Sequence, residues 1–436
     1  KCGLMTKTNQ KLIRNVCFFF VLMVFVVSCN KDDKNGGKPY DPKIPVAFNT
    51  FLPDSGGIAT KMVLLGKNFG NDPSMIKVYF NEKQASVVGV DDDLIYVMVP
   101  RQPGEISDIS VVIGKDSVVC TTKQFKYLLS ASVSPFAGVV DANGYGGFKD
   151  GSIAEAMFVS PRFINCDNEN NLFVTDNEER VRLISPQTDQ VITLADHIAR
   201  PVGGCTSTDG KRVYISAYVW RTSTTDRNVY CFDPDRQWNA YVVPTNIPRD
   251  RVDWVSQLAI DEDEILYFGA ENGDLFKVDT KTGEWGYLAQ GVTRSGDYVY
   301  AAYSQKDRRV YIATRYENKI YYFDLKTNEF KFLAGSSRGH NDGPGDEAQF
   351  STPTQIAVDL DGNLIVADRD NHVIRMVRPD GYTSTIAGVP GERGYMNGIP
   401  EKSLFSSPYG VCVSPVDGAI YVADMGNYRI RRIMIE

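Results

Sequence analysis

The chain from residue 132 onward repeats one pattern, and this repetition limits the possible folds more than any other feature. Three clear copies begin at Pro161, Pro353 and Pro408, and each contains apolar runs separated by a short polar turn. Weaker copies begin near Pro201, Val255 and Tyr298, so that successive starts are 40, 54, 43, 55 and 55 residues apart. A period of this length with several strands in each unit is typical of a β-propeller. We therefore expect residues 132–436 to form a propeller of six blades.

The last copy is incomplete, because it ends with its third strand at Ile435. The segment "SVSPFAG" at 132–138 matches the "FLAG" and "TIAG" segments that end other copies. It precedes the first inner strand. We therefore expect it to supply the missing fourth strand and to close the ring, which protects strand edges that would otherwise be exposed.

Polar, glycine-rich segments connect the copies. "FLAGSSRGHNDGPGDEAQFSTP" at 332–353 aligns with residues 136–161 and 386–408, and all three share Ala-Gly near the start and Phe and Pro at the end. A site residue is not expected to be built three times around a ring. We interpret these segments as linkers between blades in which the glycines permit unusual backbone angles, with Phe350 packed between blades. His340 has no counterpart in the other two segments, so it is not a predicted site residue.

The best copies carry a recognisable motif. Ala367-Asp368…Asn371-His372-Val373-Ile374-Arg375 and Ala423-Asp424…Asn427-Tyr428-Arg429-Ile430-Arg431 resemble NHL repeats. The first copy keeps Asp176 and Asn177 but has Glu179-Arg180 in place of the usual motif, and the middle copies have lost the aspartate. The resemblance implies an NHL-type propeller.

Residues 45–128 form a separate predicted domain. Short apolar stretches such as "MVLLG", "IKVYF", "LIYVMVP" and "ISVVIG" are separated by turn residues, which predicts a small β-sandwich. Leu65-Gly66-Lys67-Asn68-Phe69-Gly70 and Val78-Tyr79-Phe80-Asn81 resemble the IPT/TIG domain, an immunoglobulin-like fold. In that pattern Gly66 and Gly70 flank a turn and Phe69 packs under it. The fold class is thus all-β, and the resemblance implies a spacer or a protein-contact module.

The first 44 residues are predicted to target and tether the protein. Residues 1–28 have a basic start and an apolar run of 12 residues at 16–27, which is too short to span a bilayer, and so indicate a signal peptide. Val27-Ser28-Cys29 resembles a bacterial lipobox, which implies cleavage before Cys29 and lipid attachment to it. Residues 29–44 form a flexible tether. Lys31-Asp32-Asp33 resembles the export signal of Bacteroides-type lipoproteins, so we expect an outer-membrane lipoprotein that faces the cell exterior.

Charge and cysteine spacing exclude some functions. The net charge is −7 although residues 1–28 contain four basic residues and no acid, so nucleic acid is not an expected partner. The five cysteines beyond Cys29 show no CxxC spacing, which disfavours zinc, and three of them fall within strand-like runs as small buried residues. These three are Cys166, Cys205 and Cys412.

Propeller connectivity selects one face for a site. Loops that lead into the inner strands and loops between second and third strands lie on the same face. Exposed aromatic rings can stack on a sugar ring, and arginine supplies directional hydrogen bonds. The same rings could instead pack between blades. The predicted ligand-binding residues on this face are Trp220, Trp254, Tyr298, Tyr409, Arg162 and Arg221.

Three functions remain open. Chains with this order of parts resemble accessory proteins of Bacteroides-type polysaccharide uptake, so the first hypothesis is a non-catalytic, lipid-anchored surface protein that binds a polysaccharide or oligosaccharide without a cofactor. The second is a protein–protein scaffold that docks an outer-membrane partner. The third is a metal-dependent lyase or lactonase of the propeller type. Asp167, Asp261 and Asp359 end inner strands, but their expected role is to form the turn to the next strand.

Overall fold

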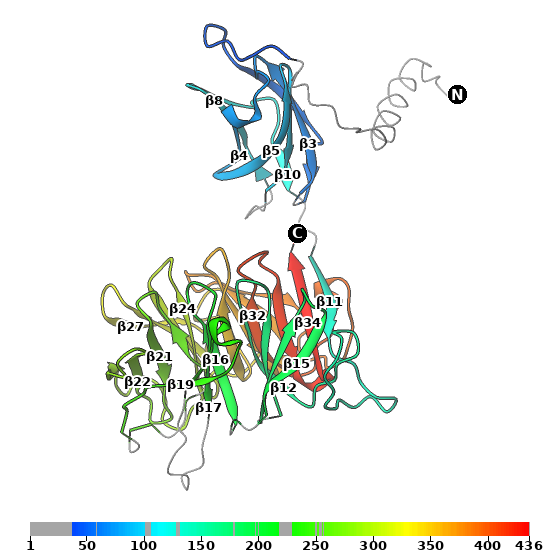
Figure 1. Ribbon diagram of the computed structural model, residues 1–436. Helices are drawn as coiled ribbons and strands as arrows, with labels where there is room; N and C mark the ends of the chain where they lie inside the picture. The colour runs from blue at the N-terminus through cyan, green and yellow to red at the C-terminus, as the bar shows by residue number, and fades with distance from the viewer. Residues whose placement is uncertain are drawn as a thin grey trace. The chain divides into compact units, whose positions relative to one another are not determined.

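The protein is described here as a computed structural model that covers residues 37–57, 59–100, 106–127, 131–177, 179–196, 198, 200–217, 229–248, 251–252, 255 and 257–435. The predicted signal peptide, Cys29, Trp220, Arg221 and Trp254 lie outside these residues. The chain divides after Tyr127 into two compact units. Apart from a few single-turn 3₁₀ helices, the regular elements of the described residues are β-strands (Figure 1). No helix among these residues has the length and apolar character needed to cross a bilayer.

The first unit contains two β-sheets. The stretches predicted as strands form β3 (Lys61–Lys67), β4 (Ile76–Phe80), β6 (Leu94–Met98) and β8 (Ile109–Ile113). The seven-stranded sheet adds β1 (Ala47–Leu52), β5 (Lys83–Asp91) and β9 (Asp116–Val119), in the order β1-β3-β6-β5-β4-β8-β9. The smaller sheet has the order β2-β10-β7, from β2 (Ser55–Gly56), β10 (Phe125–Tyr127) and β7 (Ile106–Ser107), and the helix η1 (Pro73–Met75) precedes β4.

Alternation along these strands builds the core of the first unit. In β8 every second residue is buried, as a strand with one face on the core requires. Phe51, Phe80 and Phe125 are fully buried, and the rings of Phe80 and Phe125 meet edge to face with centroids 5.5 Å apart. Gly66 has to lack a side chain, since a Cβ there would lie 2.1 Å from the Phe69 ring. This contact confirms the predicted packing of Phe69.

The second unit consists of repeated four-stranded antiparallel sheets in a propeller-like arrangement. Each sheet runs from an inner first strand outward in chain order, apart from the sheet that contains the C-terminal strand. The predicted starts at Pro161, Pro201, Pro353 and Pro408 coincide with the first residues of inner strands. The sheets described are β12 (Pro161–Cys166), β13 (Leu172–Asp176), β14 (Arg180–Ser185), β15 (Gln190–Ala195); β16 (Pro201–Thr206), β17 (Val213–Ala217), β18 (Val229–Phe232), β19 (Tyr241–Val243); β20 (Ala259–Ile260), β21 (Ile265–Gly269), β22 (Leu275–Asp279), β23 (Trp285–Ala289); β24 (Val299–Ser304), β25 (Arg309–Thr314), β26 (Lys319–Asp324), β27 (Glu329–Ala334); β28 (Pro353–Val358), β29 (Leu364–Asp368), β30 (Val373–Val377), β31 (Thr383–Ala387); and β32 (Pro408–Val413), β33 (Ile420–Asp424), β34 (Arg429–Ile435) with β11 (Ala131–Ala137).

The strand β11 closes the ring. It pairs antiparallel with β34, with Val133 opposite Ile433 in the register, and the two strands lie side by side in Figure 1. The prediction that residues 132–138 complete the last sheet is therefore confirmed. The inner strands contact one another in chain order from β12 to β32, and β32 in turn packs against β12.

The linkers pack their aromatic residue between sheets, as predicted. Phe350 and its two counterparts, Phe158 and Phe405, are fully buried. The glycine of each Ala-Gly pair has a positive φ, which is 97° at Gly138, 106° at Gly335 and 100° at Gly388. A residue with a side chain would be strained in this backbone conformation. The remaining 3₁₀ helices are η2 (Pro234–Arg236), η3 (Arg369–Asn371), η4 (Pro400–Lys402) and η5 (Met425–Asn427).

Candidate functional site

The ring of inner strands surrounds a channel with two ends. The end at which the inner strands begin is called the strand-start face here, and the opposite end is called the strand-end face. Loops between second and third strands lie at the strand-start face, because the second strand runs antiparallel to the first. Turns between first and second strands lie at the strand-end face.

Tyr409 is the centre of an aromatic and cationic cluster at the strand-start face. It is the second residue of β32, and two guanidinium groups lie near its ring, with the Arg162 carbon 5.9 Å and the Arg369 carbon 5.8 Å from the ring centroid. Arg162 is the second residue of β12, and Arg369 begins η3. Phe163 meets the Tyr409 ring edge to face at 5.2 Å. Three separate sheets thus contribute to the surroundings of one tyrosine.

A second set of rings adjoins this group. The Arg315 guanidinium lies 5.0 Å from the Tyr298 ring centroid and 5.4 Å from that of Tyr316. Tyr300, two residues after Tyr298 on the same strand, places its hydroxyl 3.4 Å from that of Tyr409. Burial raises the pKa of the Tyr298 and Tyr300 hydroxyls above their usual value, so both remain protonated and able to donate a hydrogen bond.

The structure therefore brings three predicted site residues into one region. The Arg162 guanidinium contacts the Tyr409 ring. The Tyr298 ring lies beside Arg315, and Tyr300, on the same strand as Tyr298, places its hydroxyl near that of Tyr409. The other three, Trp220, Arg221 and Trp254, are not among the described residues, so their place at this face stays a prediction. Sequence reasoning did not identify Phe163, Tyr300 or Arg369 as members. The alternation of side chains along β24 was a signal for Tyr300, because residues two apart share a face.

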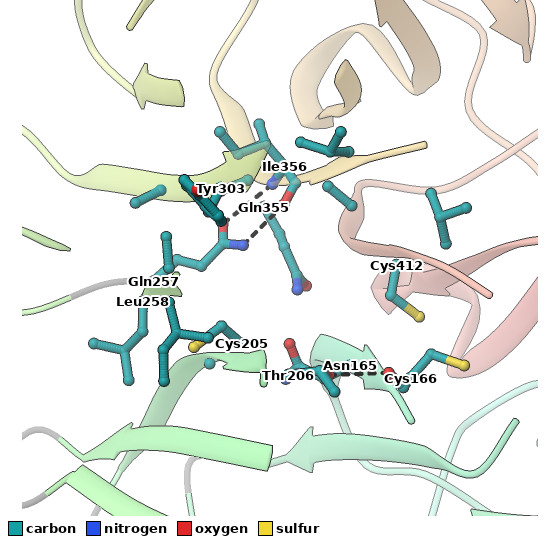
Figure 2. Close-up of a pocket in the computed structure, with 18 of the residues that line it drawn as sticks. Asn165, Cys166, Cys205, Thr206, Gln257, Leu258, Tyr303, Gln355, Ile356 and Cys412 are labelled. Atoms are coloured by element: carbon teal, nitrogen blue, oxygen red, sulfur yellow. Dashed lines mark hydrogen bonds between the residues drawn. The ribbon is translucent and has the colours of Figure 1, made fainter. Parts of the chain in front are cut away.

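The strand-end face contains a pocket in the channel (Figure 2). Its volume is about 290 Å³, and small and amide-bearing residues of the inner strands form most of its wall. The polar side chains include Asn165, Thr206 and Ser207, and the Asn165 amide nitrogen is buried without a hydrogen-bond partner. The predicted ligand-binding residues Arg162, Tyr298 and Tyr409 are not among the described residues that line this pocket.

Two glutamines bind the inner strands together across the channel. The Gln355 amide donates to Ile164 O at 2.7 Å, and its carbonyl accepts from Ile164 N at 2.9 Å. Gln257 makes the equivalent pair of bonds with Ile356, at 2.8 and 3.2 Å, and Figure 2 shows its amide meeting that backbone. Both glutamines are buried, and each satisfies a backbone donor and a backbone acceptor that would otherwise be unpaired. These bonds make the glutamines part of the architecture.

The predicted buried cysteines line the same pocket. Cys166 and Cys412 are buried and Cys205 is half-buried. Burial raises the pKa of the Cys205 and Cys412 thiols well above their usual value, which keeps them protonated and unreactive. No group of three or more His, Cys, Asp or Glu side chains among the described residues could hold a metal ion.

The aspartates that end inner strands form turns. Asp167 accepts hydrogen bonds from the backbone of Glu169 and Asn171, and Asp359 does the same for Asp361 and Asn363. Asp261 bonds the backbone of Asp263 and Ile265 and also the Tyr267 hydroxyl. The predicted turn role is confirmed at all three positions.

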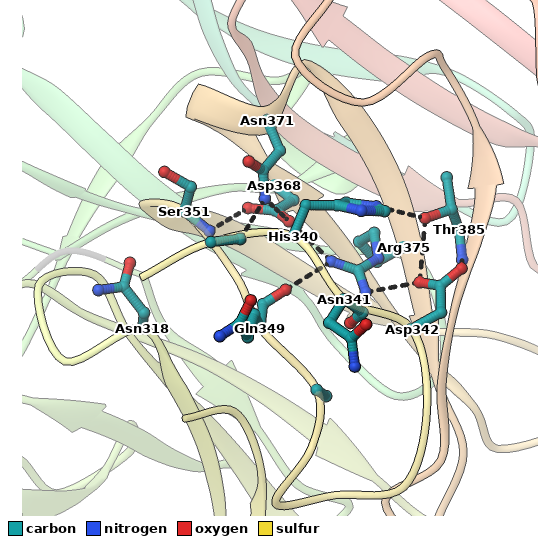
Figure 3. Close-up of polar contacts among 12 residues, drawn as sticks. Asn318, His340, Asn341, Asp342, Gln349, Ser351, Asp368, Asn371, Arg375 and Thr385 are labelled. Carbon is teal, nitrogen blue, oxygen red and sulfur yellow. Dashed lines mark hydrogen bonds and ion pairs between the residues drawn. The ribbon is translucent and has the colours of Figure 1, made fainter. Parts of the chain in front are cut away.

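The NHL-like motif builds buried ion pairs, one of which is drawn in Figure 3. Arg375 binds Asp368 at 2.9 Å and Asp342 at 2.6 Å, and it also donates to two linker carbonyls. Arg431 repeats this arrangement with Asp424 and Asn397. His340 bonds Thr385 at the edge of the network, and His372 accepts from Ser407 N.

The first sheet also contains this arrangement, which sequence reasoning missed. Arg182 binds Asp176 at 3.3 Å and Asp150 at 2.7 Å, although Glu179-Arg180 replace the usual motif in the sequence. The loop after Asp176 is one residue shorter than the loop after Asp368, so the arginine comes one position earlier. Because Asp176, Asp368, Asp424 and their arginines are all buried, the network is structural.

Comparisons with known proteins agree with this architecture. Residues 47–127 match the model of the IPT/TIG domain. Over 316 residues the chain is 26% identical to NHL repeat-containing protein 2 of Gallus gallus, an alignment that covers 66% of this chain and 41% of that protein. The chain thus spans less than half the length of that curated relative.

Two solved structures share most of the chain's fold. A structural genomics protein of unknown function from Bacteroides thetaiotaomicron VPI-5482 is 27% identical with a TM-score of 0.80, and the match covers 91% of this chain and 100% of that one. An auxiliary nutrient binding protein from the same organism is 24% identical with a TM-score of 0.63, over 91% of this chain and 99% of that one. An IPT/TIG domain followed by an NHL-repeat-like, propeller-like unit is therefore the architecture of this chain.

Proposed function

We propose that this chain is a non-catalytic binding protein that holds a glycan at the strand-start face of a six-bladed propeller. The observation that carries the proposal is the cluster in which Arg162 and Arg369 lie near the Tyr409 ring, with Tyr298 and Tyr300 nearby. Aromatic faces stack on the C–H groups of sugar rings, and guanidinium groups donate directional hydrogen bonds to ring hydroxyls. The predicted Trp220, Trp254 and Arg221 would add to this surface.

The description of one similarly folded protein as an auxiliary nutrient binding protein supports a role in nutrient capture. With Cys29 as a lipid-attachment residue, the chain would be anchored in the outer membrane and would face the cell exterior. Residues 29–44 and the IPT/TIG domain would then separate the binding face from the lipid anchor. Capture of a polysaccharide or oligosaccharide for uptake fits such a position.

The geometry favours binding over metal-dependent catalysis. The lactonase hypothesis would use Asp167, Asp261 and Asp359, but these carboxylates accept backbone hydrogen bonds in turns. His340 and His372 make separate contacts with Thr385 and Ser407. These side chains do not converge on one point, as ligands of a catalytic metal do.

A glycan array followed by calorimetric titration tests the proposal. We expect at least one oligosaccharide to bind, and Tyr409→Ala or Trp254→Ala to weaken binding about tenfold or more, since stacking aromatics are frequent hot spots. Tyr382→Ala is the matched control, because Tyr382 is an exposed ring at the turn after β30, at the strand-end face. Absence of glycan binding, or binding unchanged in both variants, would refute the proposal. Capture of an outer-membrane protein that the same variants abolish would instead establish the scaffold function.

A further inference from the structure

We propose that the pocket at the strand-end face is a second binding site, which holds a small neutral polyhydroxy compound such as a monosaccharide. The pocket lies at the opposite end of the channel from Tyr298 and Tyr409, so this inference goes beyond the proposed function and does not depend on it. It rests on the depth and size of the pocket, on an unpaired buried amide in its wall, and on the uncharged character of the described residues that line it.

The pocket is a deep recess of defined size. Its wall runs from Thr208 and Gln305, which are exposed at the mouth, to Gln257 and Gln355, whose exposed fractions are 4% and 1%. These two glutamines extend across the channel at the inner end, where Figure 2 shows the amide of Gln257 against the backbone of Ile356. A volume of about 290 Å³ holds about ten waters, which suits a ligand of about a dozen non-hydrogen atoms.

Asn165 is the polar side chain that the fold leaves unpaired in this wall, where Figure 2 shows it beside Cys166 and Thr206. It is 5% exposed, and neither Oδ1 nor Nδ2 has a hydrogen-bond partner among the described residues. Nδ2 is enclosed against Gly204, since a Cβ at Gly204 would lie 3.1 Å from it, whereas Oδ1 is not enclosed and faces the pocket. An unpaired amide at such a buried position is costly. A ligand hydroxyl that donates to Oδ1 would supply the missing bond.

Other polar groups of the wall can bind further hydroxyls. The Thr206 hydroxyl donates to Cys166 O at 2.9 Å, which leaves its oxygen able to accept. The side chains of Thr208 and Gln305 make no hydrogen bond to another described residue. Half-buried apolar side chains such as Val413 lie between these polar groups. A sugar presents hydroxyls at its edge and C–H groups on its faces, so it matches a wall of this mixed character.

The wall offers no counterion to a charged ligand. Among the described residues that line the pocket there is no Asp, Glu, Lys, Arg or His. The turns at the rim belong entirely to the described part of the chain, and their Asp167, Asp261 and Asp359 accept backbone hydrogen bonds. A charged ligand would therefore lose its hydration without gaining an ion pair, which is unfavourable. Neutral hydroxyls exchange hydrogen bonds with water for hydrogen bonds with the wall.

Titration of the full chain with single sugars tests the proposal. The probes are glucose, galactose, mannose and N-acetylglucosamine, each followed by saturation-transfer NMR and by calorimetry, with glucuronate and glucosamine as charged counterparts. We expect at least one neutral sugar to bind with a Kd of about 1 mM or lower, and the charged counterparts to bind about tenfold more weakly. Absence of binding by every neutral sugar, or equal or tighter binding of a charged counterpart, would overturn the proposal.

Variants establish that the sugar binds at this end of the channel. Asn165→Leu keeps the approximate size of the side chain and removes the amide, so affinity should fall about tenfold or more. The free energy of unfolding should not fall, because the amide makes no hydrogen bond to the described residues, and a purely structural role would give the opposite result. Gln305→Ala should weaken binding about threefold, and because Gln305 is exposed, this variant keeps the proposal testable if Asn165→Leu is unstable.

Gln187→Ala is the matched control. Gln187 is an exposed glutamine in the turn between β14 and β15, outside the pocket, and its replacement should leave the affinity for the sugar unchanged. Unchanged affinity in Gln305→Ala and in a folded Asn165→Leu protein would place the sugar elsewhere and overturn the proposal. Loss of oligosaccharide binding in Tyr409→Ala concerns the strand-start face, so failure of the proposed function is distinguishable from failure of this inference.

Discussion

At the scale of single residues, the buried Asp–Arg pairs explain why the NHL-like motif recurs. Asp368 accepts a hydrogen bond from Ser351 N, where the linker turns into the inner strand, and another from Asn371. Arg375 joins the same carboxylate to two linker carbonyls and lies 5.0 Å from the Phe350 ring centroid. One ion pair therefore fixes the third strand, the linker and its aromatic residue together.

Replacement of Arg375 tests the importance of this network. Arg375→Met should lower the free energy of unfolding by about 3–5 kcal/mol, because it leaves Asp368 as an unpaired buried charge. Denaturant unfolding measures the change. Arg378→Met, which alters an exposed arginine of the same sheet, should cost no more than about 0.5 kcal/mol. A loss below about 1 kcal/mol in Arg375→Met would show that the pair contributes little.

The same pair predicts a pH dependence. Burial raises the pKa of Asp368 to about 6, although Arg375 opposes the shift. The folded state therefore holds more protons than the unfolded state between about pH 4 and 6, so this carboxyl adds about 1 kcal/mol of stability as the pH falls from 7 to 5. The wild type should gain this amount relative to Asp368→Asn over that range.

Unfolding of both proteins at pH 7 and pH 5 measures the difference. Burial lowers the pKa of His340 and His372, which costs stability as the pH falls, but this effect is common to both proteins. Asp380→Asn is the control, since the pKa of Asp380 is lowered and its effect is confined to more acidic solution. A constant difference between wild type and Asp368→Asn would contradict the prediction.

At the scale of elements, closure of the ring depends on a strand that is distant in the sequence from its partner. The strand β11 precedes all the inner strands in the chain, yet it pairs with the last strand, β34. Val133 anchors it, since this side chain is buried among residues of β29 to β33 and its backbone N–H bonds Gly398 O at 2.8 Å. The linker before β32 therefore also takes part in closure.

A charge at Val133 should open this closure. Val133→Asp buries an unpaired carboxylate and should cost about 3 kcal/mol or more. Amide hydrogen exchange should then accelerate in β34 but not in β24 and β25, which lie in another sheet. Ser132→Asp, at an exposed position of the same strand, should change neither quantity. Equal exchange in β34 of both variants would argue against β11 as the closing strand.

At the scale of the whole molecule, each of the two units has its own hydrophobic core. The cluster that contains Phe51, Phe80 and Phe125 consists only of residues of the first unit. The cores of the second unit lie between neighbouring sheets and contain no residue of the first. Such separation is typical of domains that fold independently.

Residues 45–128 expressed alone should therefore fold. We expect a cooperative unfolding transition for this fragment at the same denaturant concentration as one transition of the full chain, because its core needs no contribution from the second unit. Denaturation followed by circular dichroism measures both proteins. A fragment that is unfolded in the absence of denaturant would show that the first unit depends on the rest of the chain.

Local patterns in the sequence were enough to predict much of this fold. The strand starts at proline, the aspartate turns and the packed linker aromatics depend on residues close together in the chain, and each recurs in three or more copies. The same is true of the apolar strands around Phe69 in the first unit. The position of Arg182 was missed because one residue is absent from the preceding loop, and spacing alone does not show how a loop closes.

Only the tertiary structure decided which distant side chains meet. Gln355 bonds Ile164 across 191 residues, and Tyr300 reaches Tyr409 across 109. Such pairs depend on how far each strand projects into the channel, which follows from the packing of whole sheets. The sequence alone determined the repeat and the face on which Arg162, Tyr298 and Tyr409 were expected, because strand direction follows from chain order.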